Sequence, residues 1–224
     1  HALIGGVIGA VGVSAGFGAL NEQGILKIFL SLILSPIVAM VGGYIIMKVL
    51  LFIFGRFSPI ALNDRFRNMQ VLSAILMAFS HGSNDAQKAM GIITLTLLSG
   101  GYISTMDVPT WVKLACATSM ACGTAVGGWK IISTMGTKIF KMETINGFAA
   151  DLNSALTIFT ATFLHLPVST THVVSGSIMG VGSSKRIKAV NWGVARSMVM
   201  AWCVTIPLSA VMSALIYEIG HFLF

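Results

Sequence analysis

The sequence predicts an all-α, polytopic helical membrane protein, and three observations support this fold class. Of the 224 residues, 55% are hydrophobic and only 9% are charged, whereas soluble domains carry about 25% charged residues. The mean hydropathy is +0.88. The apolar residues also gather in runs that approach the roughly 20 residues a transmembrane helix requires. We therefore expect a multi-pass protein surrounded by membrane lipid rather than a single soluble core.

The net charge and the spacing of the cysteines argue against two further functions, nucleic-acid binding and metal binding by cysteine. The formal net charge is +7, but membrane proteins gather Lys and Arg in their cytoplasmic loops, so we expect no nucleic-acid partner. Three cysteines lie within apolar runs without the spacing of a metal site: Cys116, Cys122 and Cys203. We interpret them as small packing residues.

The first two segments of the chain are residues 1–23 and 24–68. The first is apolar and rich in glycine, and Gly5 and Gly9 have the G-x-x-x-G spacing that lets helix backbones approach closely. The second predicts a transmembrane helix, kinked at Pro36, followed by a basic cytoplasmic loop.

A central core is predicted over residues 69–188. Its first part, 69–99, is apolar except for the polar stretch Ser80–Lys88. Neither apolar half is long enough to cross a membrane alone, so the pattern predicts one span that is interrupted at its middle. Residues 110–128 predict the next transmembrane helix.

The last part of the core, 144–182, predicts a re-entrant helical hairpin. It holds two apolar pieces around Pro167, and the second is too short to cross a membrane. A basic cluster follows the hairpin: Lys185, Arg186 and Lys188. Placing this cluster on the same side as the earlier basic loops requires the chain to enter and leave on one side, with the tip at Pro167–Thr171. Residues 189–224 form a C-terminal transmembrane helix.

The hairpin tip has the chemistry of an anion site. Pro167 disfavours helix at the residue before it and predicts a new helix start near Ser169. The first turn of a helix has unpaired N–H groups and the positive end of the helix dipole, which both attract anions. Three adjacent hydroxyl residues stand there: Ser169, Thr170 and Thr171. The alternative is an ordinary hydroxyl cap that bonds its own helix.

An internal repeat is indicated by two short stretches. Residues 1–9 align on residues 172–180 with the histidine and both glycines at one offset. Transporters often contain such repeats in inverted orientation. We expect the first copy on the outer face and the second on the inner face.

Five ordered motifs resemble those of the inorganic phosphate transporter (PiT) family. They are His81-Gly82-Ser83-Asn84-Asp85-Ala86-Gln87-Lys88-Ala89-Met90-Gly91, Gly127-Gly128-Trp129-Lys130, Thr134-Met135-Gly136, Gly147-Phe148-Ala149-Ala150-Asp151 and Pro167-Val168-Ser169-Thr170-Thr171-His172. The resemblance implies secondary transport of phosphate with Na⁺ or H⁺ as the coupling ion and no other cofactor. It also implies two inverted repeats that share one site, a homodimer, and a multi-pass protein of the plasma membrane.

The chain resembles the C-terminal repeat of a bacterial member, with the tail of the N-terminal repeat attached. The missing N-terminal repeat would then supply the other half of the site. Two positions depart from the family pattern. Lys88 stands where many members have Asn, which puts a cation contact there in doubt, and Asp151 stands where many have Glu.

The resemblance assigns roles to seven residues. We expect phosphate to contact Ser169, Thr170, Thr171 and Asn84, whose neutral donors permit release. We expect the coupling cation at Asp85, the Na⁺ candidate, with Asn84, Gln87 and Asp151 as further contacts. An ionised residue within a membrane span is costly and usually functional. The alternative is that Asp85 is simply paired with Lys88, three residues along one helix face.

Three other functions remain open from the residues. An intramembrane hydrolase would pair Ser169 or Ser83 with His172 or His81. Ser169 and His172 share one helix turn, which is a poor arrangement for attack on a third group. A channel would need an open pore, whereas a coupling acid favours alternating access. A transporter of another small oxyanion would use the same tip.

Overall fold

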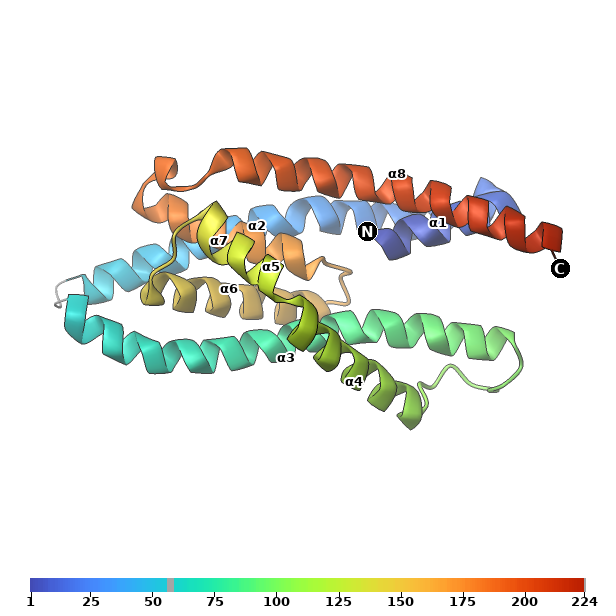
Figure 1. Ribbon diagram of the computed structural model, residues 1–224, viewed down its shortest axis with the longest axis horizontal. Helices are drawn as coiled ribbons and strands as arrows, with labels where there is room; N and C mark the ends of the chain where they lie inside the picture. Colours follow the sequence, from blue (N-terminus) through green and yellow to red (C-terminus); the bar gives the residue numbers. More distant parts are fainter. Residues whose placement is uncertain (56–58, 224) are drawn as a thin grey trace. The chain divides into compact units, whose positions relative to one another are not determined.

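The computed structural model of the chain describes residues 1–55 and 59–223, and within these residues it contains helices and no strand. The α-helices are α1 (Ala2–Ser14), α2 (Glu22–Phe54), α3 (Pro59–Ser99), α4 (Thr110–Gly127), α5 (Trp129–Ser133), α6 (Thr144–Phe163), α7 (Thr170–Lys185) and α8 (Trp192–Leu223) (Figure 1). Between them lie the short 3₁₀ helices η1 (Phe17–Ala19) and η3 (Ile187–Ala189) and the π-helix η2 (Thr134–Ile139). The all-α prediction is confirmed. Residues 56–58, at the start of the predicted basic loop, lie outside the described residues.

The chain forms two compact units. One unit contains His1–Ile33 and Asn191–Phe224, and the other contains Leu34–Val190. The second unit holds every residue to which the sequence assigned a binding role.

Two helices among the described residues, α2 and α8, are long and apolar enough to cross a membrane. Both carry large apolar side chains on their surfaces, for example Ile33 and Ile45 on α2 and Leu208 and Ile216 on α8. Exposed apolar surface of this extent marks contact with a membrane or another protein. The two spans predicted at these positions therefore have the length and the surface that lipid contact requires.

The glycines of α1 bring it close to α8 in the first unit. A Cβ atom at Gly5 would collide with the carbonyl oxygen of Ile206, and one at Gly9 would collide with the carbonyl oxygen of Ala210. Ser213 donates a hydrogen bond of 2.7 Å to the Gly6 carbonyl across the same interface. The close approach predicted from the glycine spacing is confirmed.

Helix α3 is continuous, so the predicted interruption at Ser80–Lys88 is wrong. The helix runs for 41 residues from Pro59 to Ser99. The stretch Ser80–Lys88 lacks proline, and an unbroken helix satisfies its own backbone groups. Its polar side chains reach the hairpin tip instead, as described below, and this contact removes the need for a break.

Helices α6 and α7 form the predicted hairpin, which lies against α3. Near the start of α6, Gly147 contacts the side chain of Gln70 on α3. At the other end of α6, the hairpin tip contacts α3 at Asn84 and Lys88. These two residues lie roughly 16 to 22 Å before the end of α3, given the rise of 1.5 Å per residue. The tip therefore stops near the middle of α3, as expected for a re-entrant hairpin.

An ion pair joins the two open ends of the hairpin. Lys185, the last residue of α7, lies 2.6 Å from Glu143, which precedes α6. The chain thus enters and leaves the hairpin at one place. Its location on the cytoplasmic side stays a prediction.

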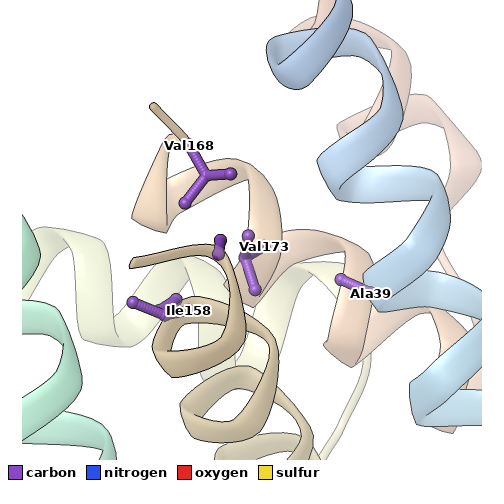
Figure 2. Packing of buried hydrophobic residues seen from close by; sticks show 5 residues of the cluster. Ala39, Ile158, Val168 and Val173 are labelled. Carbon is purple, nitrogen blue, oxygen red and sulfur yellow. The ribbon is translucent and has the colours of Figure 1, made fainter. Parts of the chain in front are cut away.

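Hydrogen bonds and apolar packing join the interior of the hairpin to the second half of α2. Asn153 of α6 donates hydrogen bonds to the Ala39 carbonyl (2.8 Å) and to the Ser177 hydroxyl (2.7 Å). Figure 2 shows the adjacent apolar cluster, in which Ala39 of α2 and Ile158 of α6 pack with Val168 and Val173 of the hairpin. This packing fixes the position of the tip.

We expect the buried amide to stabilise the hairpin more than the terminal ion pair does. Lys185→Ala should lower the free energy of unfolding by less than about 1 kcal/mol, because exposed ion pairs contribute little; the Glu143 side chain is 69% exposed. Asn153→Ala should lower it by about 2 kcal/mol, because it leaves buried partners unpaired. Thermal unfolding in detergent measures both. A larger loss in Lys185→Ala than in Asn153→Ala would contradict this ranking.

The local structure shows further similarity between the two stretches of the predicted repeat. The order α1, η1, α2 parallels the order α7, η3, α8. The side chain of Asn21 accepts the Gly24 N–H (3.0 Å) near the start of α2, and Asn191 accepts the Val194 N–H (3.3 Å) near the start of α8. These features support a repeat. Its inverted orientation stays a prediction.

Candidate functional site

The candidate site is built on the start of α7. Ser169 has extended backbone angles and α7 begins at Thr170, as Pro167 predicted. The Ser169 side chain makes no capping hydrogen bond to this helix. The interpretation of this hydroxyl as an ordinary cap is therefore wrong. The helix start keeps donors for a ligand, together with the positive end of the helix dipole.

Asp85 lies at the centre of a polar cluster beside this helix start. Lys88 donates a hydrogen bond of 2.9 Å to Asp85 Oδ1. Thr170 Oγ1 donates one of 3.1 Å to Asp85 Oδ2, and His81 Nε2 lies 3.5 Å from the same oxygen. The Asp85 side chain is 27% exposed. The carboxylate thus links α3 directly to the first residue of α7.

A second contact fastens the tip to α3 through a backbone carbonyl. Lys88 Nζ donates a hydrogen bond of 2.9 Å to the Val168 oxygen. Asn84 Nδ2 reaches the same oxygen at 3.5 Å. Asn84 is buried and Lys88 is partly exposed. The Val168 oxygen at the tip therefore accepts hydrogen bonds from one buried and one partly exposed side chain.

The structure brings together only some of the predicted site residues. Asn84, Asp85 and Thr170 meet in the polar cluster, and Ser169 adjoins it. Thr171 and Gln87 are exposed, and Asp151 is half-buried on α6. Among the described residues, the hydrogen bonds and ion pairs of Asp85 do not include Gln87 or Asp151.

Sequence reasoning missed two members of the cluster. From the sequence, His81 suggested only a base for the hydrolase alternative, although it stands four residues before Asp85 and therefore shares its helix face. That spacing was a usable signal. The Val168 carbonyl gave no signal, because its partners Asn84 and Lys88 lie 84 and 80 residues away in the chain.

A helical hairpin whose tip meets a partly buried carboxylate on a neighbouring helix is typical of membrane transporters. Comparison with known proteins agrees with this class. Residues 56–213 match the family model described as the phosphate transporter family. The chain belongs to the phosphate transporter family. The predicted resemblance is confirmed, and the hydrolase alternative is wrong because this is a family of transporters.

Individual relatives and a solved structure agree with the family. The chain is 51% identical to a probable low-affinity inorganic phosphate transporter of Bacillus subtilis (strain 168), over 100% of this chain and 68% of that protein. It is 44% identical to the protein so described in Rhizobium meliloti (strain 1021), over 97% of this chain and 65% of that one. A solved structure titled "The sodium-dependent phosphate transporter" matches with a TM-score of 0.66 and 25% identity, over 100% of this chain and 64% of that one. The chain thus spans about two thirds of the length of these proteins.

Proposed function

We propose that the intact protein moves inorganic phosphate across the plasma membrane by ion-coupled secondary transport with alternating access. The observation that carries this proposal is the uncapped start of α7 beside the Asp85 cluster. This chain would supply about half of the central site. A second repeat, inverted relative to this one, would supply the other half.

Phosphate would bind at the first turn of α7. Backbone N–H groups there and the hydroxyls of Ser169 and Thr171 are neutral donors that suit phosphate oxygens. The Thr170 hydroxyl has one proton, which it donates to Asp85, and it would exchange that partner for phosphate. The Asn84 amide lies at the same tip. Neutral donors hold an anion without a full opposing charge, so the bound phosphate can leave on the other side.

Ion coupling would take place at Asp85. A carboxylate within a membrane span is costly, and its contact with Thr170 gives the coupling ion, Na⁺ or H⁺, a direct route to the phosphate donors. Gln87 and Asp151 stay secondary candidates for this role. We also propose that α3 and α4 cross the membrane with α2 and α8, and that the intact protein is a homodimer.

Uptake of labelled phosphate into proteoliposomes tests the proposal. The intact transporter, reconstituted at a defined ratio of protein to lipid, should accumulate phosphate above the level of empty liposomes. Unlabelled phosphate should compete and unlabelled sulfate should not. Equal competition by sulfate would point to a transporter of oxyanions in general, and accumulation no greater than in empty liposomes would contradict phosphate transport.

The Thr170 hydroxyl provides a specific prediction. Thr170→Val should reduce phosphate uptake about tenfold, because it removes a hydrogen bond to a charged group at the tip. Thr170→Ser keeps the hydroxyl and should retain most of the uptake. Thr96→Val is the matched control, since the Thr96 hydroxyl bonds only the Ile92 carbonyl of its own helix. Equal uptake by Thr170→Val and Thr96→Val would show that the Thr170 hydroxyl does not contribute to the phosphate site.

A further inference from the structure

Lys88 lies where a coupling cation would bind. A hard cation such as Na⁺ takes oxygen ligands from carboxylates, hydroxyls and backbone carbonyls. The tip offers one of each, in Asp85, Thr170 and Val168. The Lys88 ammonium lies 2.9 Å from both Asp85 Oδ1 and the Val168 oxygen. It therefore occupies the space between the carboxylate and the carbonyl.

The backbone of α3 offers Na⁺ no substitute ligands. Transporters that bind Na⁺ near the bilayer midplane use carbonyls freed by an unwound helix. Helix α3 is unbroken from Pro59 to Ser99, so the carbonyls around Asp85 remain in the helical hydrogen-bond ladder. The arrangement thus does not fit Na⁺ at Asp85.

The lysine also balances the charge of the tip. Asp85 and Lys88 form an ion pair within one helix face. Within the part of the chain that the structure describes, the Thr170 hydroxyl and the His81 ring also contact Asp85. A carboxylate that already has a fixed cation does not need a dissolved one before an anion approaches the start of α7.

We propose that Lys88 is a built-in cation that takes the place of Na⁺ between Asp85 and the hairpin tip, and that it makes this transporter independent of sodium. This inference rests on the proposed phosphate transport and removes Na⁺ from the coupling ions that could act at Asp85. The binding of an ion is coupled to the binding of phosphate only if the affinity for the ion changes when phosphate is bound. Since the Lys88 ammonium excludes Na⁺ from Asp85, no binding of Na⁺ at Asp85 can be coupled to the binding of phosphate. Lys88 is thereby the residue that determines ion specificity.

Phosphate uptake in matched sodium and potassium salts tests this role. The intact transporter should take up phosphate at rates that agree within about twofold in the two salts. Lys88→Asn removes the ammonium and leaves an amide oxygen, so its uptake should be at least about tenfold faster in sodium, because the repulsion of a second cation is gone. Lys88→Arg keeps the positive charge and should remain insensitive to sodium.

Thermal unfolding in the same two salts supplies a measurement that does not depend on transport. Sodium should raise the Tm of Lys88→Asn and leave those of Lys88→Arg and the unaltered protein unchanged, since a ligand stabilises only the state that binds it. Strong sodium stimulation of the unaltered protein would overturn the proposal.

Two further outcomes separate the proposal from its alternatives. If Lys88→Asn stays insensitive to sodium in both measurements and its KM for phosphate rises, Lys88 contacts phosphate and the proposal is wrong. If no variant transports phosphate, the proposed function fails. The unfolding measurement then still decides whether Lys88 excludes sodium.

Discussion

Asp85→Asn is expected to reduce phosphate uptake by the intact transporter about 100-fold, because it removes the charge from an acceptor of two hydrogen bonds, and hydrogen bonds to charged groups are each worth about 1.5–3 kcal/mol. Asp85 accepts hydrogen bonds from Lys88 and from Thr170, so it joins the middle of α3 to the start of α7. Its loss leaves the Lys88 charge without its carboxylate partner and removes the carboxylate that we propose for ion coupling. Initial rates of labelled phosphate uptake in proteoliposomes measure the effect.

Two variants separate the coupling role of Asp85 from a merely structural one. Asp107→Asn makes the same chemical change at an exposed residue between α3 and α4, and it should keep full uptake. The double variant Asp85→Asn with Lys88→Asn removes both charges, so no unpaired ammonium remains. We expect it to stay inactive, because the carboxylate itself is required. Recovery of uptake in the double variant would show that Asp85 serves only to neutralise Lys88.

Gly180→Ala should produce the largest loss of stability, a fall in Tm of about 5–10 °C, because overpacking against a backbone costs at least 1–3 kcal/mol. A Cβ atom at Gly180 would collide with the Met40 carbonyl oxygen and would lie 2.8 Å from the Met40 carbonyl carbon. The clash is with the backbone of α2, which cannot rotate away as a side chain can. Thermal unfolding of the purified protein in detergent gives the shift.

Gly91→Ala is the matched control for this prediction. Gly91 also lies within a helix, α3, but a Cβ atom there would meet no atom within 4 Å. Alanine is the better helix former, so this variant should be as stable as the unaltered protein or more so. If the two variants have equal Tm values, the contact between α7 and α2 does not position the hairpin.

The sequence determined the features that depend on neighbouring residues. Pro167 cannot continue a helix and disfavours helix before it, and α7 accordingly begins at Thr170. The small residues Gly5 and Gly9 predicted close helix contact, which depends on the absence of a side chain and not on the identity of the partner. The spacing of Asp85 and Lys88 likewise placed both on one helix face, and they are paired.

The tertiary structure decided what the polar stretch of α3 does. From the sequence alone, Ser80–Lys88 indicated a break, because polar residues at membrane depth need partners and a broken helix supplies them. The folded chain provides these partners from the hairpin tip, where Thr170 and the Val168 carbonyl meet Asp85 and Lys88. The helix can then stay intact.

These contacts join residues 80 or more positions apart, so no local pattern encodes them. The ion pair of Asp85 and Lys88 was predictable from the sequence because it spans one helix turn. The place of that pair against the Val168 carbonyl, on which the proposed exclusion of sodium from Asp85 rests, was not predictable. It depends on how far the hairpin reaches along α3, which is set by the packing of α6 and α7 on α2 and α3.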